Sequence, residues 1–568
     1  MGIIEAHRLC YTYPKAACPV LQDLCFSITP GTVTALLGCS GSGKSTLLLA
    51  LAGIIPEFYG GTWSGRLQVG HAVVTAEEPQ SAEVIEQVAI VLQVPDTQLV
   101  GFRVEETIAF GLENQGMPTA QIRERISQSL EELGITHLRH RLTDTLSGGQ
   151  KQACVLAAML ALDTPVIVLD EPTAALDPAG RVLVSRIVDR LKQLGKTLVI
   201  SDQNLDWFAP LVDCTLVLDS TGSLLFNGTL SHFLSDRDLV LRSGVPIPPL
   251  TAIVYELQRL GHQVQPWVTI ADARTWLSQH PRHVPFQLSP PSFSPSVDNI
   301  VHCTNLTYTY AGTKTPAIME ASFTADAGRI LGIIGQNGSG KSTAIRHLNG
   351  LLKPQRGTVV VAGQSTAQLT VAQLARLVGI AFQNPDLMLF NETVEQEVFF
   401  ALNLSSDKAW QVQQRAQMMA ILEQFNLAQH LGRSPLALSV GEKQLLAILC
   451  ALALNPAVLV LDEPTSGMDR AGREQLGQLL LQLKQQGKAV ICVAHDLPLL
   501  AEFADDILVF QAGRVVCSRP TRDLFADTEL FERLGIPLPI EIQLALEFLG
   551  FPCLTPAEFT NRFMTAAV

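Results

Sequence analysis

The stretch Gly335–Thr343, with the sequence GQNGSGKST, decides the fold of this chain. It follows the apolar run Ile330–Ile334, and this order predicts a buried strand that leads through a glycine loop into a helix. The glycines let backbone N–H groups approach phosphate oxygens, and the positive end of the helix faces the same oxygens. The lysine is expected to reach the β- and γ-phosphates, and the serine hydroxyl to complete a Mg²⁺ shell. The predicted ligand-binding residues of this loop are Gly335, Gly338, Gly340, Lys341, Ser342 and Thr343.

A second copy of the motif occurs earlier, as Gly38–Thr46 (GCSGSGKST) after the apolar run Val33–Leu37. The two motif lysines are 341 − 44 = 297 residues apart. A repeat of this length indicates that a whole domain is duplicated. We therefore expect two domains with equivalent nucleotide sites. The predicted ligand-binding residues of the first loop are Gly38, Gly41, Gly43, Lys44, Ser45 and Thr46.

The length and composition agree with two domains and exclude some functions. A chain of 568 residues is too long for one core. Its formal net charge of −13 argues against a nucleic-acid partner, which would need a basic face. We find no signal peptide and no apolar run of the roughly 18 residues needed to span a bilayer. The eleven cysteines form no C-x-x-C pairs, so we expect a reducing, cytosolic setting.

One tyrosine precedes each glycine loop at the same distance. Tyr13 and Tyr310 are again 297 residues apart, and each lies 31 residues before the motif lysine. An aromatic ring at such a place can stack on an adenine ring. A single tyrosine of this kind is more often a core residue, but the matched spacing favours contact with the base.

Glutamine ends a short apolar strand in each half. Gln93 follows the run 88–92, and Gln383 stands at the same place in the second copy. Each glutamine could coordinate the metal or position a water molecule, while the loop after it moves with the nucleotide. The alternative is an ordinary residue at a strand end.

The sequence LSGGQ at Leu146–Gln150 is expected to begin a helix that runs from Lys151 to about Leu162. A serine cap and two glycines at a helix start form an anion site. The second copy, LSVGE, keeps the serine and the second glycine, but valine and glutamate replace glycine and glutamine. The predicted nucleotide contacts here are Ser147, Gly148, Gly149, Gln150, Ser439, Gly441 and Glu442.

Two acidic residues end the next buried strand of each half. The first half reads VIVLDEPT up to Thr173, and the second reads LVLDEPT up to Thr465. In each pair, the aspartate suits the outer metal shell and the glutamate suits a base for attacking water. These residues are Asp170, Glu171, Asp462 and Glu463. A further strand ends 33 residues beyond each aspartate, in Gln203 in the first half and His495 in the second.

The duplicated unit includes a helical tail. The tail at 236–277 has a near copy that starts at Asp527. Between the halves, Pro281–Asp298 is rich in proline and serine and is expected to be a semi-extended linker. The expected domains are therefore residues 1–280 and 299–568.

With these motifs in this order twice, the chain resembles the ATP-binding cassette (ABC) ATPases over essentially its full length. The resemblance implies an α/β fold with two P-loop NTPase domains, each with a RecA-like core, an antiparallel β part, a helical subdomain and a C-terminal helical tail. It also implies ATP and Mg²⁺ as ligands. In this family two cassettes pair head to tail, and each ATP lies between one P-loop and the signature helix of the other cassette.

The head-to-tail rule implies two unequal composite sites. The first combines Lys44, Ser45, Gln93, Asp170, Glu171 and Gln203 with Ser439 and Gly441. The second combines Lys341, Ser342, Gln383, Asp462, Glu463 and His495 with Ser147, Gly149 and Gln150. Histidine can position the attacking water and carry charge, whereas glutamine cannot be charged. We therefore expect the second site to do most of the hydrolysis and the first mainly to bind ATP.

A narrower resemblance concerns the membrane partner. The stretches QNPD at Gln383–Asp386 and QVPDTQLVG at Gln93–Gly101, together with the doubled tail, look like the ATPases of energy-coupling factor (ECF) transporters. These drive a membrane T-component that partners a substrate-binding S-component for a vitamin or metal, which implies a peripheral place on the cytoplasmic face of the membrane. The apolar stretches Leu99–Phe110 and Leu387–Phe400 either line the grooves for that component or pack inside the helical subdomain.

Three other functions agree with only part of the sequence. A tandem ATPase of another importer, such as a monosaccharide system, shares the enzyme and differs in its partner. A soluble tandem ABC protein that acts on ribosomes or DNA would need a charged helical linker or a basic face. A nucleotide sensor without turnover fits the first site and not the second.

Overall fold

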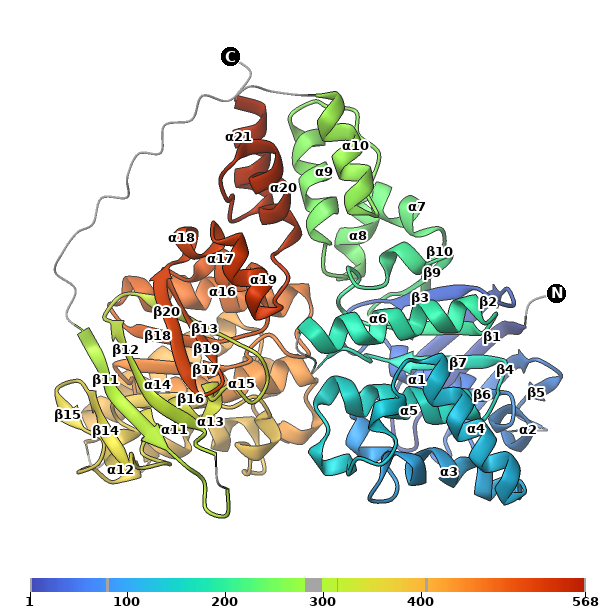
Figure 1. Cartoon of the computed structure of the whole chain (residues 1–568), viewed down its shortest axis with the longest axis horizontal. Coiled ribbons are helices and arrows are strands. Elements are labelled where there is room, and N and C mark those ends of the chain that lie inside the picture. The colour runs from blue at the N-terminus through green and yellow to red at the C-terminus, as the bar shows by residue number, and fades with distance from the viewer. Residues whose placement is uncertain are drawn as a thin grey trace. The chain divides into compact units, whose positions relative to one another are not determined.

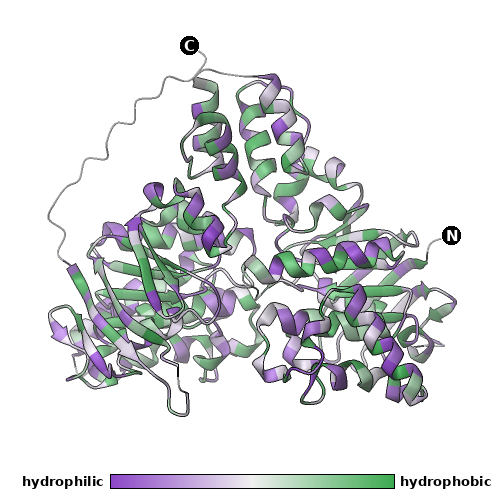
Figure 2. Ribbon diagram, viewed as in Figure 1, coloured by the Kyte–Doolittle hydropathy of each residue, from purple (hydrophilic) through white to green (hydrophobic). Residues whose placement is uncertain are grey.

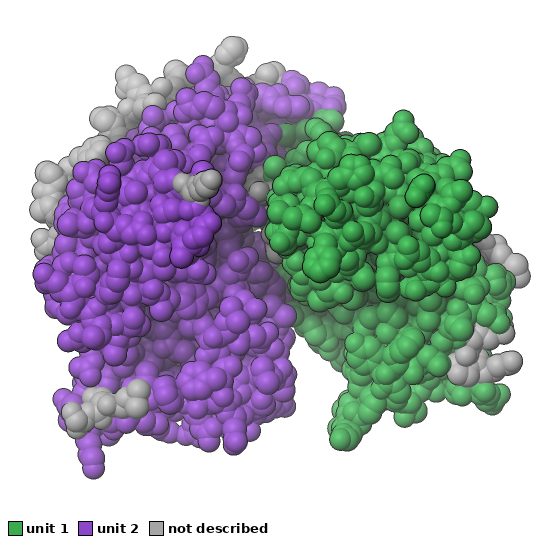
Figure 3. All heavy atoms as spheres, turned by 60° about the horizontal axis from the view of Figure 1, so that its bottom comes forward, with its two compact units in different colours: residues 1–273 green, residues 274–568 purple. Residues whose placement is uncertain are grey.

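The computed structural model describes residues 3–77, 81–174, 176, 178–280, 299–313, 315–403 and 407–565. The chain divides into two compact units, residues 1–273 and 274–568, which are coloured green and purple in Figure 3. The division falls inside one helix, and the proline- and serine-rich stretch at 281–298 lies outside the described residues. Each unit is described by itself.

The centre of unit 1 is a six-stranded sheet with the order β10-β9-β3-β8-β7-β6. Neighbours from β9 to β6 pair in parallel, and β10 is an antiparallel edge. Its strands are β3 (Val33–Leu37), β6 (Val88–Val91), β7 (Val166–Asp170), β8 (Thr197–Ser201), β9 (Cys214–Leu218) and β10 (Leu224–Gly228). The inner strands β3, β7 and β8 are buried along their whole length and are mostly apolar, because helices or a second sheet cover both faces.

A smaller antiparallel sheet with the order β2-β1-β4-β5 completes the β part of unit 1. Its strands are β1 (Ile4–Thr12), β2 (Leu21–Ile28), β4 (Thr62–Val69) and β5 (Ala72–Val74). Buried side chains alternate along β2, as expected where one face of a strand is packed.

The helices of unit 1 fall into three groups along the chain (Figure 1). The first group belongs to the core and contains α1 (Lys44–Leu51), α2 (Ser81–Ile85) and α6 (Pro178–Gln193). The second forms the helical subdomain from α3 (Val104–Asn114), α4 (Thr119–Glu132) and α5 (Gly148–Ala161). The tail contains α7 (Leu230–Ser235), α8 (Arg237–Ser243) and α9 (Pro249–Arg259), followed by α10 (Ile270–Gln279), the helix in which the division between the units falls.

Successive residues of one central strand serve two hydrophobic cores. Leu36 packs with α1 and the small sheet, whereas Ala35 and Leu37 pack with α5 and α6. This alternation follows from the two-residue period of a strand. In Figure 2 the strands are mostly green, while α6 carries both purple and green, as expected for a helix with one buried face.

Unit 2 repeats the topology. Its six-stranded sheet has the order β16-β17-β18-β13-β19-β20, and its small sheet has the order β12-β11-β14-β15. The larger sheet contains β13 (Ile330–Ile334), β16 (Val378–Ala381), β17 (Val458–Asp462), β18 (Ala489–Val493), β19 (Asp506–Gln511) and β20 (Arg514–Pro520). The smaller contains β11 (Asn299–Tyr308), β12 (Ile318–Asp326), β14 (Arg356–Val361) and β15 (Gln364–Ser365).

The helices of unit 2 follow the same three groups. Core helices are α11 (Lys341–Leu348), α12 (Val371–Leu374), α16 (Arg470–Gln485) and α17 (Leu497–Phe503). The helical subdomain contains α13 (Val394–Asn403), α14 (Lys408–Gln424) and α15 (Val440–Leu452). The tail contains α18 (Thr521–Phe525), α19 (Thr528–Leu534), α20 (Ile540–Leu549) and α21 (Pro556–Thr565). The predicted fold class is confirmed.

In each unit the tail touches the second residue of the glycine loop. A Cβ placed on Gly244, just after α8, would lie 2.8 Å from the Cβ of Cys39. In unit 2 the amide of Gln336 donates to the carbonyl of Leu534 at the end of α19, at 2.9 Å. Among the described residues, none of the helices has the length and hydropathy that a bilayer span requires.

Candidate nucleotide sites

The predicted glycine loops lie between β3 and α1 in unit 1 and between β13 and α11 in unit 2. The ammonium group of Lys44 donates to the carbonyls of Gly38 and Cys39 at 2.9 and 2.7 Å. Lys341 makes the same two bonds, to Gly335 at 2.7 Å and Gln336 at 3.0 Å. Both lysines are therefore held under a loop whose backbone wraps around them.

Two glycines of each loop are required by close packing. A Cβ on Gly38 would lie 2.6 Å from the carbonyl oxygen of Leu218, and one on Gly335 would lie 2.3 Å from that of Phe510. The residues before the two lysines are left-handed, with φ of 89° at Gly43 and 105° at Gly340. Gly41 and Gly338 have positive φ and open space beside them, so their backbone can be approached by a ligand.

The predicted base-stacking tyrosines both reach the first turn of the following helix. The hydroxyls of Tyr13 and Thr46 are 3.2 Å apart, and those of Tyr310 and Thr343 are also 3.2 Å apart. Both tyrosines are partly exposed. The structure thus brings each ring to its own phosphate loop.

The polar residues at the strand ends of unit 1 gather around one carboxylate. Glu171 accepts from the side-chain amide of Gln93 at 2.9 Å and from that of Gln203 at 3.2 Å, through different oxygens. Its backbone is left-handed, with φ of 44°, which is uncommon for a residue with a side chain. The strand order β8-β7-β6 explains the meeting, because these residues follow three adjacent parallel strands.

A second carboxylate in this cluster has no role in the sequence prediction. Asp202 is buried and accepts from Thr173 at 2.7 Å and from the indole of Trp207 at 3.1 Å. Burial, together with the charges of Asp202 and Asp170, raises the pKa of Glu171 to about 7. The signal in the sequence is a carboxylate directly after the mostly apolar strand Thr197–Ser201, next to the predicted Gln203.

In unit 2 the corresponding glutamate meets a histidine. Glu463 accepts from the backbone N–H of His495 at 3.0 Å, and the ring Nε2 of His495 lies 3.4 Å from its other oxygen. The same Nε2 is 3.0 Å from Oδ1 of Asn337, a loop residue that the sequence prediction left out. Glu463 also has a positive φ, of 51°. Gln383 is exposed at the end of β16.

Both predicted signature segments cap a helix. Ser147 caps α5 and shares a reciprocal capping box with Gln150, and Ser439 and Glu442 do the same at α15. The helix in unit 1 therefore begins at Gly148, three residues before the predicted Lys151. Replacement of the glutamine by glutamate is compatible with the box because both side chains supply the acceptor oxygen.

An ion pair that the sequence analysis missed joins each signature helix to the loop after the strand-end glutamine. Lys151 lies 2.5 Å from Asp96, and Lys443 lies 2.9 Å from Asp386. The aspartates are the D of the two PD pairs, so this part of the sequence pattern has a structural role in both units.

The residues at each site fit a nucleotide with a divalent cation. Burial raises the pKa of Asp170 and of Asp462, and each carboxylate is hydrogen-bonded to the serine of its glycine loop, Ser45 or Ser342. One oxygen of Asp170 is buried without a hydrogen-bond partner. A buried carboxylate of this kind is stabilised by a nearby cation, and oxygen donors suit Mg²⁺. The described residues include no cluster of three or more His, Cys, Asp or Glu side chains that would hold a metal alone.

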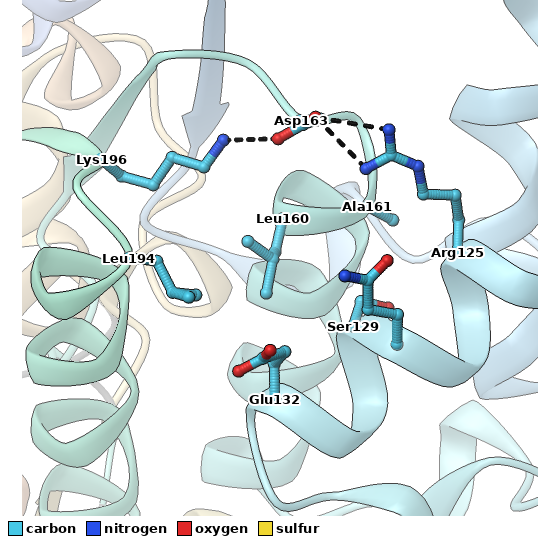
Figure 4. Close-up of a pocket in the computed structure, with 9 residues that line it drawn as sticks. Arg125, Ser129, Glu132, Leu160, Ala161, Asp163, Leu194 and Lys196 are labelled. Carbon is cyan, nitrogen blue, oxygen red and sulfur yellow. Dashed lines mark hydrogen bonds and ion pairs between the residues drawn. The ribbon is translucent and has the colours of Figure 1, made fainter.

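A cavity of about 160 Å³ in unit 1 lies away from these groups, and none of the predicted site residues lines it. It is bounded by α4, the end of α5 and the turn before β8, and Figure 4 shows Asp163 between Arg125 and Lys196 at its rim. The distances from the carboxylate are 3.3 Å to Arg125 and 2.8 Å to Lys196. Asp163 thus already neutralises Arg125 and Lys196, so these two cations do not point to an anionic ligand in the cavity.

Comparisons with known proteins agree with the geometry. The family model described as ABC transporter matches residues 21–174 and 318–466. A Methanosarcina acetivorans protein described as an ABC transporter ATP-binding protein is 33% identical over 99% of this chain and 94% of its own length. The Bacillus subtilis protein YkoD, described as an HMP/thiamine import ATP-binding protein, is 31% identical over 95% of each chain.

One solved structure covers both halves. It is the archaeal ribosome recycling factor in complex with a ribosomal stalk protein, with a TM-score of 0.56 over 94% of this chain and 92% of that chain. Its sequence identity of 19% shows the fold alone. The family match, the full-length relatives and the duplicated motifs lead to one conclusion. This chain belongs to the ABC transporter family, as an ATP-binding subunit with two cassettes whose ATPase activity is coupled to transport.

Proposed function

We propose that this chain is the paired ATPase of an energy-coupling factor importer for a vitamin or a metal ion. The observation that carries the proposal is an exposed apolar surface on each unit, directly after the strand-end glutamine. The doubled tail and the PD pairs support the ECF type. The name of the relative YkoD, which concerns import of HMP and thiamine, supports a vitamin as cargo.

The two apolar surfaces belong to the segments that follow Gln93 and Gln383, so a movement of these glutamines on nucleotide binding would also move the surfaces. In unit 1 Phe102 is 82% exposed, and in unit 2 Leu387 and Phe390 are 80% and 67% exposed. Other residues of the same stretches, such as Val104 and Phe399, are buried, so each stretch both packs inward and presents side chains outward. In unit 2 the exposed rings of Phe390 and Phe400 meet, with centroids 5.1 Å apart, and exposed apolar side chains gathered in this way favour a protein or membrane partner.

The proposed occupants are cytoplasmic helices of a membrane T-component, which would partner a substrate-binding S-component. As an ABC transporter ATP-binding subunit, the chain pairs with membrane components in general. The proposed place is the cytoplasmic face of the cell membrane, with no nucleic-acid partner. The proposed domains are residues 1–280 and 299–568, joined by the linker 281–298.

We infer that the two cassettes pair head to tail around two ATP molecules, each with Mg²⁺, and that the site with Lys341 and Glu463 does most of the hydrolysis. Glu463 would take the proton of the attacking water, and His495 would position that water and offset charge. In the other site Glu171 is held by two amides that cannot take up charge. This site would mainly bind ATP. The bound nucleotide supplies the phosphoryl group and Mg²⁺ offsets its charge.

Affinity purification of the full chain from detergent-solubilised membranes of its own organism tests the membrane partner. We expect one multi-span protein and one small membrane protein to be recovered. Phe102→Asp combined with Phe390→Asp should abolish recovery and leave ATP binding intact. The matched control is Leu481→Asp, because Leu481 is an exposed leucine on α16, 45% accessible and outside both surfaces.

Recovery of two similar permeases would replace the ECF proposal with another importer. Recovery of ribosomes or nucleic acid, with the membrane fraction empty, would overturn the proposed partner. Equal recovery with the double variant and the wild type would move the docking surface elsewhere on the chain.

A further inference from the structure

Unit 1 carries an aromatic loop that unit 2 lacks. The loop joins α1 to β4 and contains Phe58 and Tyr59, which are 71% and 53% exposed. Two large aromatic side chains in one exposed turn lose the free energy that burial would give them. Exposed aromatic side chains of this kind suggest that the loop binds a ligand or a partner.

The insertion can be counted between two equivalent glycines. Gly65 and Gly357 each pack against the bulge of the first strand, where an added Cβ would lie 2.1 Å and 2.4 Å from a carbonyl oxygen. Gly65 lies 65 − 44 = 21 residues after its motif lysine, and Gly357 lies 357 − 341 = 16 residues after its own. Unit 1 therefore has five additional residues, 21 − 16, at this place.

The loop is fixed beside the predicted base-stacking tyrosine. The buried Tyr11 donates its hydroxyl to the carbonyl of Gly60 at 2.7 Å. The rings of Tyr13 and Tyr59 meet edge to face, with centroids 6.1 Å apart and planes inclined at 75°. Because Tyr13 also reaches Thr46 of the phosphate loop, Tyr59 lies near the base end of any nucleotide held there.

In unit 2 the side-chain amide of Gln355 fixes the corresponding loop to the strand before Tyr310. Gln355 accepts from the backbone N–H of Thr309 and donates to its carbonyl, both at 2.9 Å. Thr309 is one residue before Tyr310, the counterpart of Tyr13. The shorter loop of unit 2 has no aromatic residue between Leu351 and Gly357.

We propose that Tyr59 is a second aromatic contact for the adenine of the nucleotide bound at the first glycine loop. The base would contact Tyr13 on one side and the ring of Tyr59 at an inclined angle, so that two aromatic side chains hold it. The second glycine loop has one such contact, Tyr310. Adenine nucleotides therefore stay longer on the first site, which deepens its proposed role as the binding site. The inference rests on the proposed role of the first site in binding ATP and on the predicted place of the base beside Tyr13.

The experiment measures binding to the full chain carrying Lys341→Ala, which removes the phosphate-binding lysine of the second loop and so weakens binding there. Two probes are compared by calorimetry in the presence of Mg²⁺: the non-hydrolysable ATP analogue AMP-PNP and inorganic tripolyphosphate, which has no base. Stacking of a base on an aromatic side chain strengthens nucleotide binding, and replacing that side chain by alanine removes this contribution. We expect Tyr59→Ala to weaken AMP-PNP binding about fivefold and to leave tripolyphosphate binding unchanged.

Three variants separate the possible causes. Tyr59→Phe keeps the ring and should restore most of the affinity for AMP-PNP. Phe58→Ala, in the same loop, should have less than a twofold effect, and an equal loss in this variant would overturn the proposal in favour of a general loop effect. Tyr13→Ala tests the underlying assumption. If it weakens AMP-PNP binding while Tyr59→Ala does not, Tyr59 is not a contact; if neither does, the base lies elsewhere.

Discussion

Glu171 and Glu463 occupy the same strand-end position in the two units but have different neighbours. Glu171 is held by two glutamine amides and lies near the buried Asp202. Glu463 lies against His495, which a loop asparagine orients. In the place of Asp202, unit 2 has Ala494. The comparison teaches that duplication preserved the backbone of the site while the groups around the glutamate diverged.

The largest expected effect separates the two glutamates. Glu463→Gln in the full chain should lower steady-state phosphate release by roughly 10²- to 10³-fold, because it removes the proposed base. Glu171→Gln should lower it less than about threefold. Both variants should still bind nucleotide, which calorimetry checks. Equal losses in the two variants would remove the proposed inequality of the sites.

The residue that positions water is expected to follow the same order. His495→Ala should reduce turnover by about 10²-fold, whereas Gln203→Ala should change it by less than about threefold. His495→Gln, which copies the residue of unit 1, sharpens the comparison and should resemble the alanine variant. If the histidine variants kept full turnover and Gln203→Ala lost it, the assignment of the two sites would be reversed.

A smaller effect, on the free energy of unfolding, is expected when the packed glycines of the two signature helices are replaced. A Cβ on Gly149 would lie 2.6 Å from Cα of Gly180, whereas one on Gly441 would lie 3.2 Å from the nearest atom, the carbonyl oxygen of Gly467. Gly149→Ala should therefore destabilise its unit by about 1–3 kcal/mol, and Gly441→Ala by less than about 1 kcal/mol. Thermal unfolding of both full-length variants measures this. A larger loss from Gly441→Ala would show that α15 is the more tightly packed helix.

The smallest effect concerns the ion pairs at the cavity in Figure 4. A hydrogen bond from Lys196 and the charges of Lys196 and Arg125 lower the pKa of Asp163. At the equivalent place in unit 2, Lys488 donates to the neutral Asn455 at 2.7 Å. Because Asp163 is 55% exposed, its replacement by asparagine should cost less than about 1 kcal/mol.

The sign of the pH dependence follows from the lowered pKa. The contribution of Asp163 is fully present above its unfolded pKa and is lost as the pH falls through its folded pKa. Unfolding of wild type and Asp163→Asn should therefore converge in acid and differ most near neutral pH at low salt. Asn455→Asp is the matched gain of charge in unit 2. A difference between wild type and Asp163→Asn that grew in acid would contradict the assignment.

Much of each site could be predicted because its motifs are local. A glycine loop that wraps a lysine needs glycine where the backbone is left-handed, and the capping boxes need a serine and a residue three positions later. Such requirements fall within a few residues. The contacts of Glu171 could not be predicted in this way, because Gln93, Glu171 and Gln203 become neighbours only when three separate strands pair.

The sequence by itself determined the duplication, the α/β class, the two phosphate loops and the order of the acidic and polar residues along each half, because these depend on spacing and residue type. Only the tertiary structure decided that Asp202 lies beside the predicted cluster, that Tyr59 meets Tyr13, and that the tail touches the glycine loop in each unit. These contacts join segments far apart in the chain. Their physical cause is the packing of strands and loops, which no local pattern encodes.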